Sequence, residues 1–230
     1  MKIAKPGKPK NPKQRSLYGD YQSNVLHSYY TDNNNSHKNK LPDTLSGNER
    51  PFFQNLSVVE QWIYCYQILE DSTPLANDCG VYCSAKCCSG GPNEGMLLFP
   101  GEEHIYETMD VEDIDEFTIK SSNIALPSTQ LEVKFLICKG TCNRKLRPMS
   151  CRIFPLLPWI DKKSVVRVQP DLRAVTMCPL LYNNQLPQIQ HRFAMKVKHA
   201  FLYASLIPGT MELLDLLHEE TNIMKKFIGL

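Results

Sequence analysis

The chain has 230 residues, of which 42% are hydrophobic and 22% charged, as in a globular protein with one hydrophobic core. Its 26 basic and 24 acidic residues nearly balance, and the formal net charge of +2 does not indicate a nucleic-acid partner. No apolar run approaches the roughly 20 residues that cross a bilayer, and no apolar segment follows the basic N-terminus as in a secretory signal. We therefore expect a cytoplasmic protein without a membrane partner.

Residues 1–50 are predicted to form a disordered basic and polar tail. Six basic residues precede the first acidic one, Asp20, and prolines stand among them. The polar stretch 32–40 has no apolar side chain to bury. Residues 51–230 are predicted to form one domain, with a cysteine-cluster region at 75–182 and C-terminal helices at 187–228.

The predicted ordered elements begin near Ser57, where Ser57 and Glu60 have the spacing of a capping box at the start of a helix that runs to about residue 71. A short helix is expected after Pro100, a strand at 131–137, and a hairpin between residues 153 and 168 around the turn 161–163. Two helices follow residue 187, the second capped by Thr210. The predicted fold class is α+β: a loop-rich cysteine-cluster centre with a few short strands, one helix before it and two after it.

Cysteine is the unusual feature of the composition. Eight of the nine cysteines fall between Cys79 and Cys178, and Cys65 lies upstream within the predicted first helix, where we expect a buried core thiol. In a reduced compartment, clustered cysteines indicate metal ligands or redox groups, with disulfides and coincidental core thiols as the alternatives. The candidate metal ligands are Cys79, Cys83, Cys87, Cys88, Cys138, Cys142, Cys151 and Cys178.

The spacing of these cysteines bears on the choice between iron and zinc. The first block reads C-x3-C-x3-C-C, without the C-x2-C pairs that are usual in zinc sites. Adjacent cysteines suit a polynuclear cluster better, and Cys178-Pro179 has the order seen after ferredoxin ligands. We expect an iron–sulfur cluster of the 4Fe–4S type, or else zinc. Eight thiols allow one site with spare cysteines, or two sites.

Charged residues next to the cysteines are candidates for stabilising a bound metal cluster. Arg147 and Arg152 bracket Cys151, and cations beside a thiolate cluster stabilise its negative charge, so we assign both arginines to cofactor binding. Glu102 has two interpretations: it could be a metal ligand or a general base, or it could cap the start of a helix. A cysteine–histidine nucleophile pair that uses His104 is a further alternative. No catalytic residue is assigned.

The cysteine segments resemble a known family. Residues 79–88 and 95–103, the segment R-P-x-x-C-R-x-F-P at 147–155 and the Asp171-x-Arg173 motif are similar to those of bacterial YkgJ-type cysteine-cluster proteins, which are described as having a zinc- or iron-chelating domain. The resemblance covers about residues 75–182. The same domain is similar to the core of flagellin lysine N-methylases, whose cysteines are thought to hold an iron–sulfur cluster. The resemblance implies ligands drawn from Cys79, Cys83, Cys87, Cys88, Cys142, Cys151 and Cys178.

Two functions follow as expectations. The first is a metal-binding protein, with a redox or structural role for the cluster. The alternative is an S-adenosylmethionine-dependent protein-lysine N-methyltransferase, with flagellin or another protein as its substrate. The methylases are larger than this chain, and the sequence has few residues for their extra regions.

Overall fold

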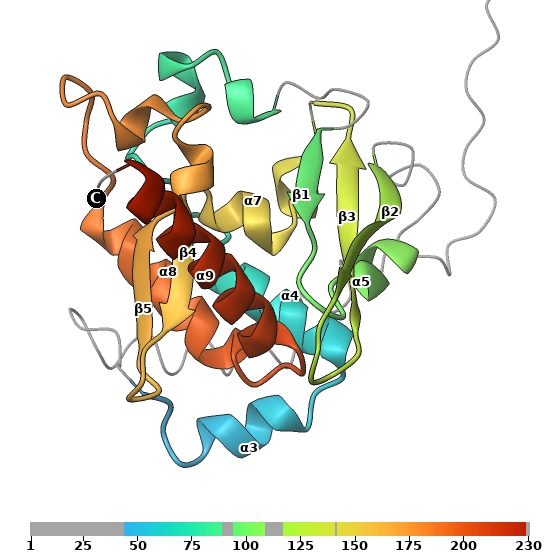
Figure 1. Ribbon diagram of the computed structural model, residues 1–230. Coiled ribbons are helices and arrows are strands. Elements are labelled where there is room, and N and C mark those ends of the chain that lie inside the picture. Colours follow the sequence, from blue (N-terminus) through green and yellow to red (C-terminus); the bar gives the residue numbers. More distant parts are fainter. Residues whose placement is uncertain (1–43, 89–93, 109–116, 141, 229–230) are drawn as a thin grey trace, which may run out of the picture.

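The computed structural model describes residues 44–88, 94–108, 117–140 and 142–228 (Figure 1). The predicted tail thus lies almost entirely outside the described residues. The predicted α+β class is confirmed. The α-helices are α3 (Glu49–Gln54), α4 (Val58–Ile68), α5 (Glu103–Glu107), α7 (Met149–Ile153), α8 (His191–Ala204) and α9 (Thr210–Ile228). The strands are β1 (Gly95–Leu97), β2 (Phe117–Ala125), β3 (Glu132–Cys138), β4 (Leu156–Ile160) and β5 (Val166–Pro170).

Helix α4 begins at the predicted capping box. The Ser57 hydroxyl accepts a hydrogen bond from the Glu60 backbone N–H at 3.4 Å, and the Glu60 carboxylate accepts one from the Ser57 N–H at 2.7 Å. The helix is buried on most sides and packs against α8, with Trp62 and Tyr66 among the largest fully buried side chains. The predicted burial of Cys65 is confirmed: it is 0% exposed, and its Sγ lies 3.6 Å from the carbonyl oxygen of Ala200.

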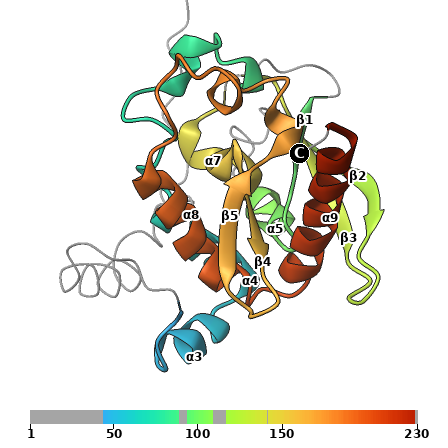
Figure 2. The ribbon, with the colours of Figure 1, turned by 60° about the vertical axis from the view of Figure 1, so that its left-hand side comes forward.

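Two small antiparallel sheets flank the centre of the molecule (Figure 1). The first has the strand order β1-β3-β2, and its central strand ends at Cys138, opposite Phe117. Gly95 is required in β1, because a Cβ there would collide with the Leu136 carbonyl of β3. The second sheet is the β4–β5 hairpin, which lies between α8 and α9 (Figure 2). Short helix α7 lies between the two sheets and leads into the hairpin.

Several sequence expectations need correction. Helix α3 precedes Ser57 and buries Phe53 completely, so ordered structure begins earlier than predicted. Two helices rather than one therefore precede the cysteine region. The first hairpin strand is β4 rather than residues 153–154, because Ile153 ends α7. Thr210 is the first residue of α9, and its buried hydroxyl has no hydrogen-bond partner among the described residues, so it does not cap the helix.

Within the described residues, no helix is long and apolar enough to span a membrane.

Candidate metal centre

The first cysteine block is a tight double turn at one end of the molecule. Two short 3₁₀ helices, η1 (Cys79–Tyr82) and η2 (Lys86–Cys88), are joined by Ser84 and Ala85, both of which have positive φ angles near 50°. Two consecutive left-handed residues reverse the chain sharply between Cys83 and Cys87. Asp78 begins the turn by accepting a hydrogen bond from the Gly80 N–H at 3.0 Å. Sulfur atoms at x3 spacing are thereby brought onto one compact loop.

The remaining cysteines come from three other segments. The first runs from the end of β3, at Cys138, to Cys142, which precedes the 3₁₀ helix η3 (Arg144–Leu146). The second is α7, which carries Cys151, and the third contains Cys178, which precedes the 3₁₀ helix η5 (Pro179–Leu181). All nine cysteines of the chain are free thiols. The segment that carries Cys178 (orange) lies at the same end of the molecule as the first block (Figure 1). Lys86 strengthens this arrangement, because its Nζ donates to the carbonyl oxygen of Thr176 at 3.2 Å.

Four of the thiols surround a small cavity, and we call them the first thiol set: Cys79, Cys83, Cys87 and Cys178. The cavity has a volume of about 20 Å³, close to that needed for a single water molecule. Its other walls are apolar and include Phe154, Pro155, Met177 and Leu180. Burial raises the pKa values of Cys79 and Cys178; Asp78 and the Cys83 thiolate raise that of Cys79 further, and the Cys79 and Cys83 thiolates raise that of Cys178.

The other four thiols, the second thiol set, interact with one another and with one arginine. They are Cys88, Cys138, Cys142 and Cys151. Burial raises the pKa of Cys151 well above its usual range, and the other three members of the set raise it further. Arg147 opposes this effect: it hydrogen-bonds Cys142 and interacts electrostatically with Cys88 and Cys151. A part of Arg147 in cofactor binding stays a prediction.

Cys87 and Cys88 link the two sets. The two neighbouring thiols influence each other: the pKa of Cys88 is lowered to about 6 by Cys87, Arg147 and Arg144, and the pKa of Cys87 is raised by Cys88. The thiolate is the form of cysteine that binds metals.

The thiols are close but do not form a finished site. In the described part of the chain, no group of three or more His, Cys, Asp or Glu side chains is arranged so that it could hold a metal ion. The donor types nevertheless fit a thiolate-ligated metal, because the eight cysteines are soft sulfur ligands and a cation, Arg147, lies among them. Metal binding would require the cysteine loops to close further.

Arg152 supports the site from behind. Its Nε donates to the Arg147 carbonyl at 2.7 Å, a terminal nitrogen donates to the Lys145 carbonyl at 2.5 Å, and its guanidinium lies 4.1 Å from the centre of the Tyr66 ring. These contacts fix the turn that carries Cys151. A direct part of Arg152 in cofactor binding stays a prediction.

Glu102 is a second supporting group, and its capping interpretation needs revision. Its side chain does not cap its own helix α5; it is fully buried and accepts hydrogen bonds from the Tyr66 hydroxyl and the backbone N–H groups of Phe99 and Met149. Burial raises the pKa of Glu102 to about 7, against the lowering effect of these bonds and of Arg152. The carboxylate thereby joins α4 to the beginning of α7. His104, the other candidate, is on the surface and pairs with Glu107 at 2.7 Å.

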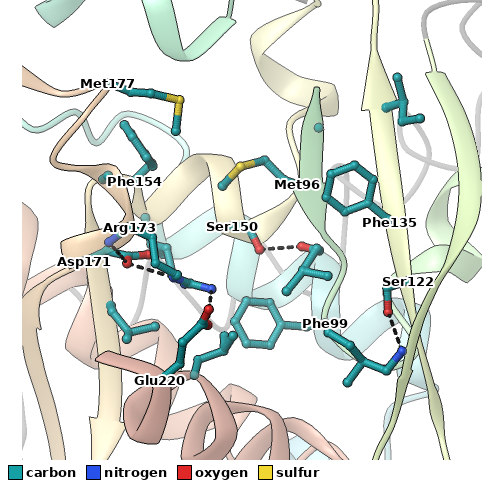
Figure 3. Close-up of a pocket in the computed structure, with 18 of the residues that line it drawn as sticks. Met96, Phe99, Ser122, Phe135, Ser150, Phe154, Asp171, Arg173, Met177 and Glu220 are labelled. Atoms are coloured by element: carbon teal, nitrogen blue, oxygen red, sulfur yellow. Dashed lines mark hydrogen bonds and ion pairs between the residues drawn. The ribbon is translucent and has the colours of Figure 1, made fainter. Parts of the chain in front are cut away.

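A larger cleft adjoins the first thiol set. Its volume is about 580 Å³, and it lies between the three-stranded sheet on one side and η4 (Leu172–Ala174) with α9 on the other (Figure 3). Most of the lining is apolar, and one wall carries a chain of ion pairs in which Arg173 contacts Asp171 at 2.7 Å and Glu220 at 3.6 Å. Phe154 and Met177 line both the cleft and the cysteine cavity.

Sequence reasoning missed this cleft, although the Asp171-x-Arg173 motif belongs to it. Its other members come from segments that are distant in sequence, and most of them are apolar residues of ordinary core type, so no local pattern indicates that they meet at one cleft. Glu220 comes from α9, which carried no functional expectation.

Comparison of the chain with protein-family models, with curated proteins and with solved structures found no match.

Proposed function

We propose that this chain binds metal through its clustered cysteine thiolates, either as an iron–sulfur cluster or as zinc. The observation that carries the proposal is the gathering of eight free thiols from four separate segments around Arg147 and a small cavity. Four thiolates complete the coordination of one tetrahedral zinc or one four-iron cluster. The metal would supply structural cross-links, or a redox centre if it is iron.

The weak packing of the cysteine loops supports a structural contribution. Neither η1 nor η2 contains a buried residue, and Val81 and Tyr82 are 74% and 44% exposed. Such a segment gains little free energy from apolar burial. In thiolate sites of this kind the free energy of metal binding is also free energy of folding, so a bound metal would stabilise this end of the molecule.

The test is purification without oxygen, followed by analysis of iron, zinc and acid-labile sulfide and by a visible absorption spectrum. We expect bound metal: iron with labile sulfide and a brown colour, or zinc with neither. The Cys65→Ser variant serves as the control and should retain the same metal content, since Cys65 is buried beside Ala200. A metal-free protein whose melting temperature does not change on adding iron and sulfide or zinc would overturn the proposal.

Methyl transfer to protein lysines is the second candidate, and the cleft beside the first thiol set is the observation that favours it. Its volume of about 580 Å³ is within the range of small-molecule sites. Incubation with labelled S-adenosylmethionine and candidate protein substrates, flagellin among them, tests this function. Label in the substrate protein would establish it, and absence of both binding and transfer would remove it.

A further inference from the structure

One wall of the large cleft carries an arginine that the protein holds in a fixed position. The Arg173 side chain donates two hydrogen bonds to Asp171, from Nε at 2.9 Å and from Nη2 at 2.7 Å, and Asp171 is only 9% exposed. This paired contact sets the plane of the guanidinium. Its third nitrogen, Nη1, lies on the side of Glu220, as Figure 3 shows.

The contact between Arg173 and Glu220 is loose. Nη1 lies 3.6 Å from the nearest Glu220 carboxylate oxygen, which is too far for a hydrogen bond. The Glu220 side chain is 56% exposed on α9, and an ion pair of this kind contributes little to stability. Glu220 can therefore turn toward solvent at little cost and leave one edge of the guanidinium open to another acceptor.

The remaining charges of the cleft favour an anion in that place. With Glu220 turned away, the charged lining residues are the Arg173–Asp171 pair and Lys120, an exposed residue of β2. Their sum is one positive charge, which a single carboxylate balances. A carboxylate also matches the planar edge of a guanidinium in shape.

The rest of the cleft is suited to an apolar group. Phe99 and Phe135 are among its lining residues, and its volume of about 580 Å³ is within the range of small-molecule sites. The hydroxyl groups of Ser122 and Ser150, which also line it, already donate to backbone carbonyl oxygens at 2.5 Å. These hydroxyl protons are used within the protein, so the charged wall is the part that can recognise a polar group.

We propose that the cleft binds a small apolar carboxylic acid, whose carboxylate replaces Glu220 at Nη1 of Arg173 and whose apolar part fills the cleft. The proposal goes beyond metal binding and does not depend on it, because none of its residues is a cysteine.

Calorimetric titration of the unaltered chain at neutral pH tests the charge of the ligand. The probes are octanoate and phenylpropanoate, with octanol and octylamine as matched neutral and cationic molecules. We expect octanoate to bind about tenfold tighter than octanol, since it adds a charge-assisted hydrogen bond. Tighter binding of octylamine, equal binding of octanol and octanoate, or binding of neither acid would overturn the proposal.

Variants of α9 test the place of binding. Glu220→Gln removes the competing carboxylate and should tighten octanoate binding several-fold. Glu219→Gln is the matched control: it removes the same charge from the neighbouring exposed position, which is not among the residues that line the cleft. Equal effects of the two substitutions would show only a general charge effect, and weaker binding by Glu220→Gln would assign the site to a cation. Either result overturns the proposal.

A double variant tests Arg173 without leaving an unpaired buried charge. Asp171→Asn combined with Arg173→Gln removes both members of the pair. The preference for octanoate over octanol should disappear, while octanol still binds. Circular dichroism checks that the variant is folded, and a retained preference in the folded variant would exclude Arg173 as the carboxylate-binding group.

Discussion

The Nε of Arg152 donates a 2.7 Å hydrogen bond to the carbonyl oxygen of Arg147, across the turn that carries Cys151. The same guanidinium also bonds the Lys145 carbonyl and lies over the Tyr66 ring. The two arginines that bracket Cys151 therefore have different tasks. Arg147 directs its charge at the thiols, and Arg152 holds the backbone that presents them.

Replacing Arg152 by Lys should lower the free energy of unfolding by roughly 1–3 kcal/mol, because an ammonium group cannot reproduce the planar, two-carbonyl contact and the ring stacking. Urea denaturation measures the change. The matched control is Arg192→Lys, on the exposed side of α8, which should stay within about 0.5 kcal/mol of the unaltered protein. Equal effects of the two substitutions would contradict the supporting part of Arg152.

Glu102→Gln should change the pH dependence of stability. Burial raises the pKa of Glu102 to about 7, so between about pH 4.5 and 7 the folded state holds a proton that the unfolded state releases. The contribution of Glu102 to the free energy of unfolding therefore falls as the pH rises through this window. The size of the fall is on the order of 3 kcal/mol.

The measurement is the difference between the unfolding free energies of the two proteins at pH values from 4.5 to 8. The difference should shift in favour of the Gln variant as the pH rises to 7, and then level off. Other titrating groups are common to both proteins and cancel. Two parallel curves would show that the Glu102 pKa is not raised in the folded state.

If the proposed function is correct, Cys151→Ser should lose bound metal and should weaken the folding of the segments around α7. Cys65→Ser should keep the full metal content and cost on the order of 1 kcal/mol. The two variants are purified together under nitrogen, and metal per chain is measured for each. Metal loss in the Cys65 variant with retention in the Cys151 variant would reverse the assignment of ligands.

Two buried threonines of α9 form a matched pair for stability. The Thr210 hydroxyl has no partner among the described residues, whereas Thr221 donates to the Leu217 carbonyl at 2.9 Å. Thr210→Val should be neutral or stabilising by about 1 kcal/mol, because an unpaired buried hydroxyl is replaced by a methyl group. Thr221→Val should destabilise by about 1 kcal/mol. Thermal or urea unfolding decides the signs, and a clear loss of stability in Thr210→Val would reveal a hydrogen bond to its hydroxyl.

Elements with a strong local signal were predictable from the sequence. The capping box at Ser57, the alternating residues of β3 and the apolar faces of α8 and α9 depend on neighbouring residues only. Strand β2 was missed because its polar centre has no alternation, and a register shift between Ser121 and Ile124 interrupts its pairing with β3. Helix α7 was missed because it has only five residues, and its first N–H is bonded by Glu102, 47 positions earlier.

The candidate site, too, was predictable only in part. The list of cysteines follows from composition and spacing alone. The grouping of Cys79, Cys83 and Cys87 around one small cavity depends on the reversal at Ser84 and Ala85, two residues without the glycine that usually marks a positive φ. It depends also on Cys178, which the fold brings from 90 residues beyond Cys88. Neither feature has a signature in the local sequence.

Phe154 and Met177 line both the cysteine cavity and the large cleft, and Figure 3 shows the two side chains at the cleft. A molecule that fills the cleft would contact the same two side chains that enclose the first thiol set. Occupancy of one space would therefore be communicated to the other through these two side chains.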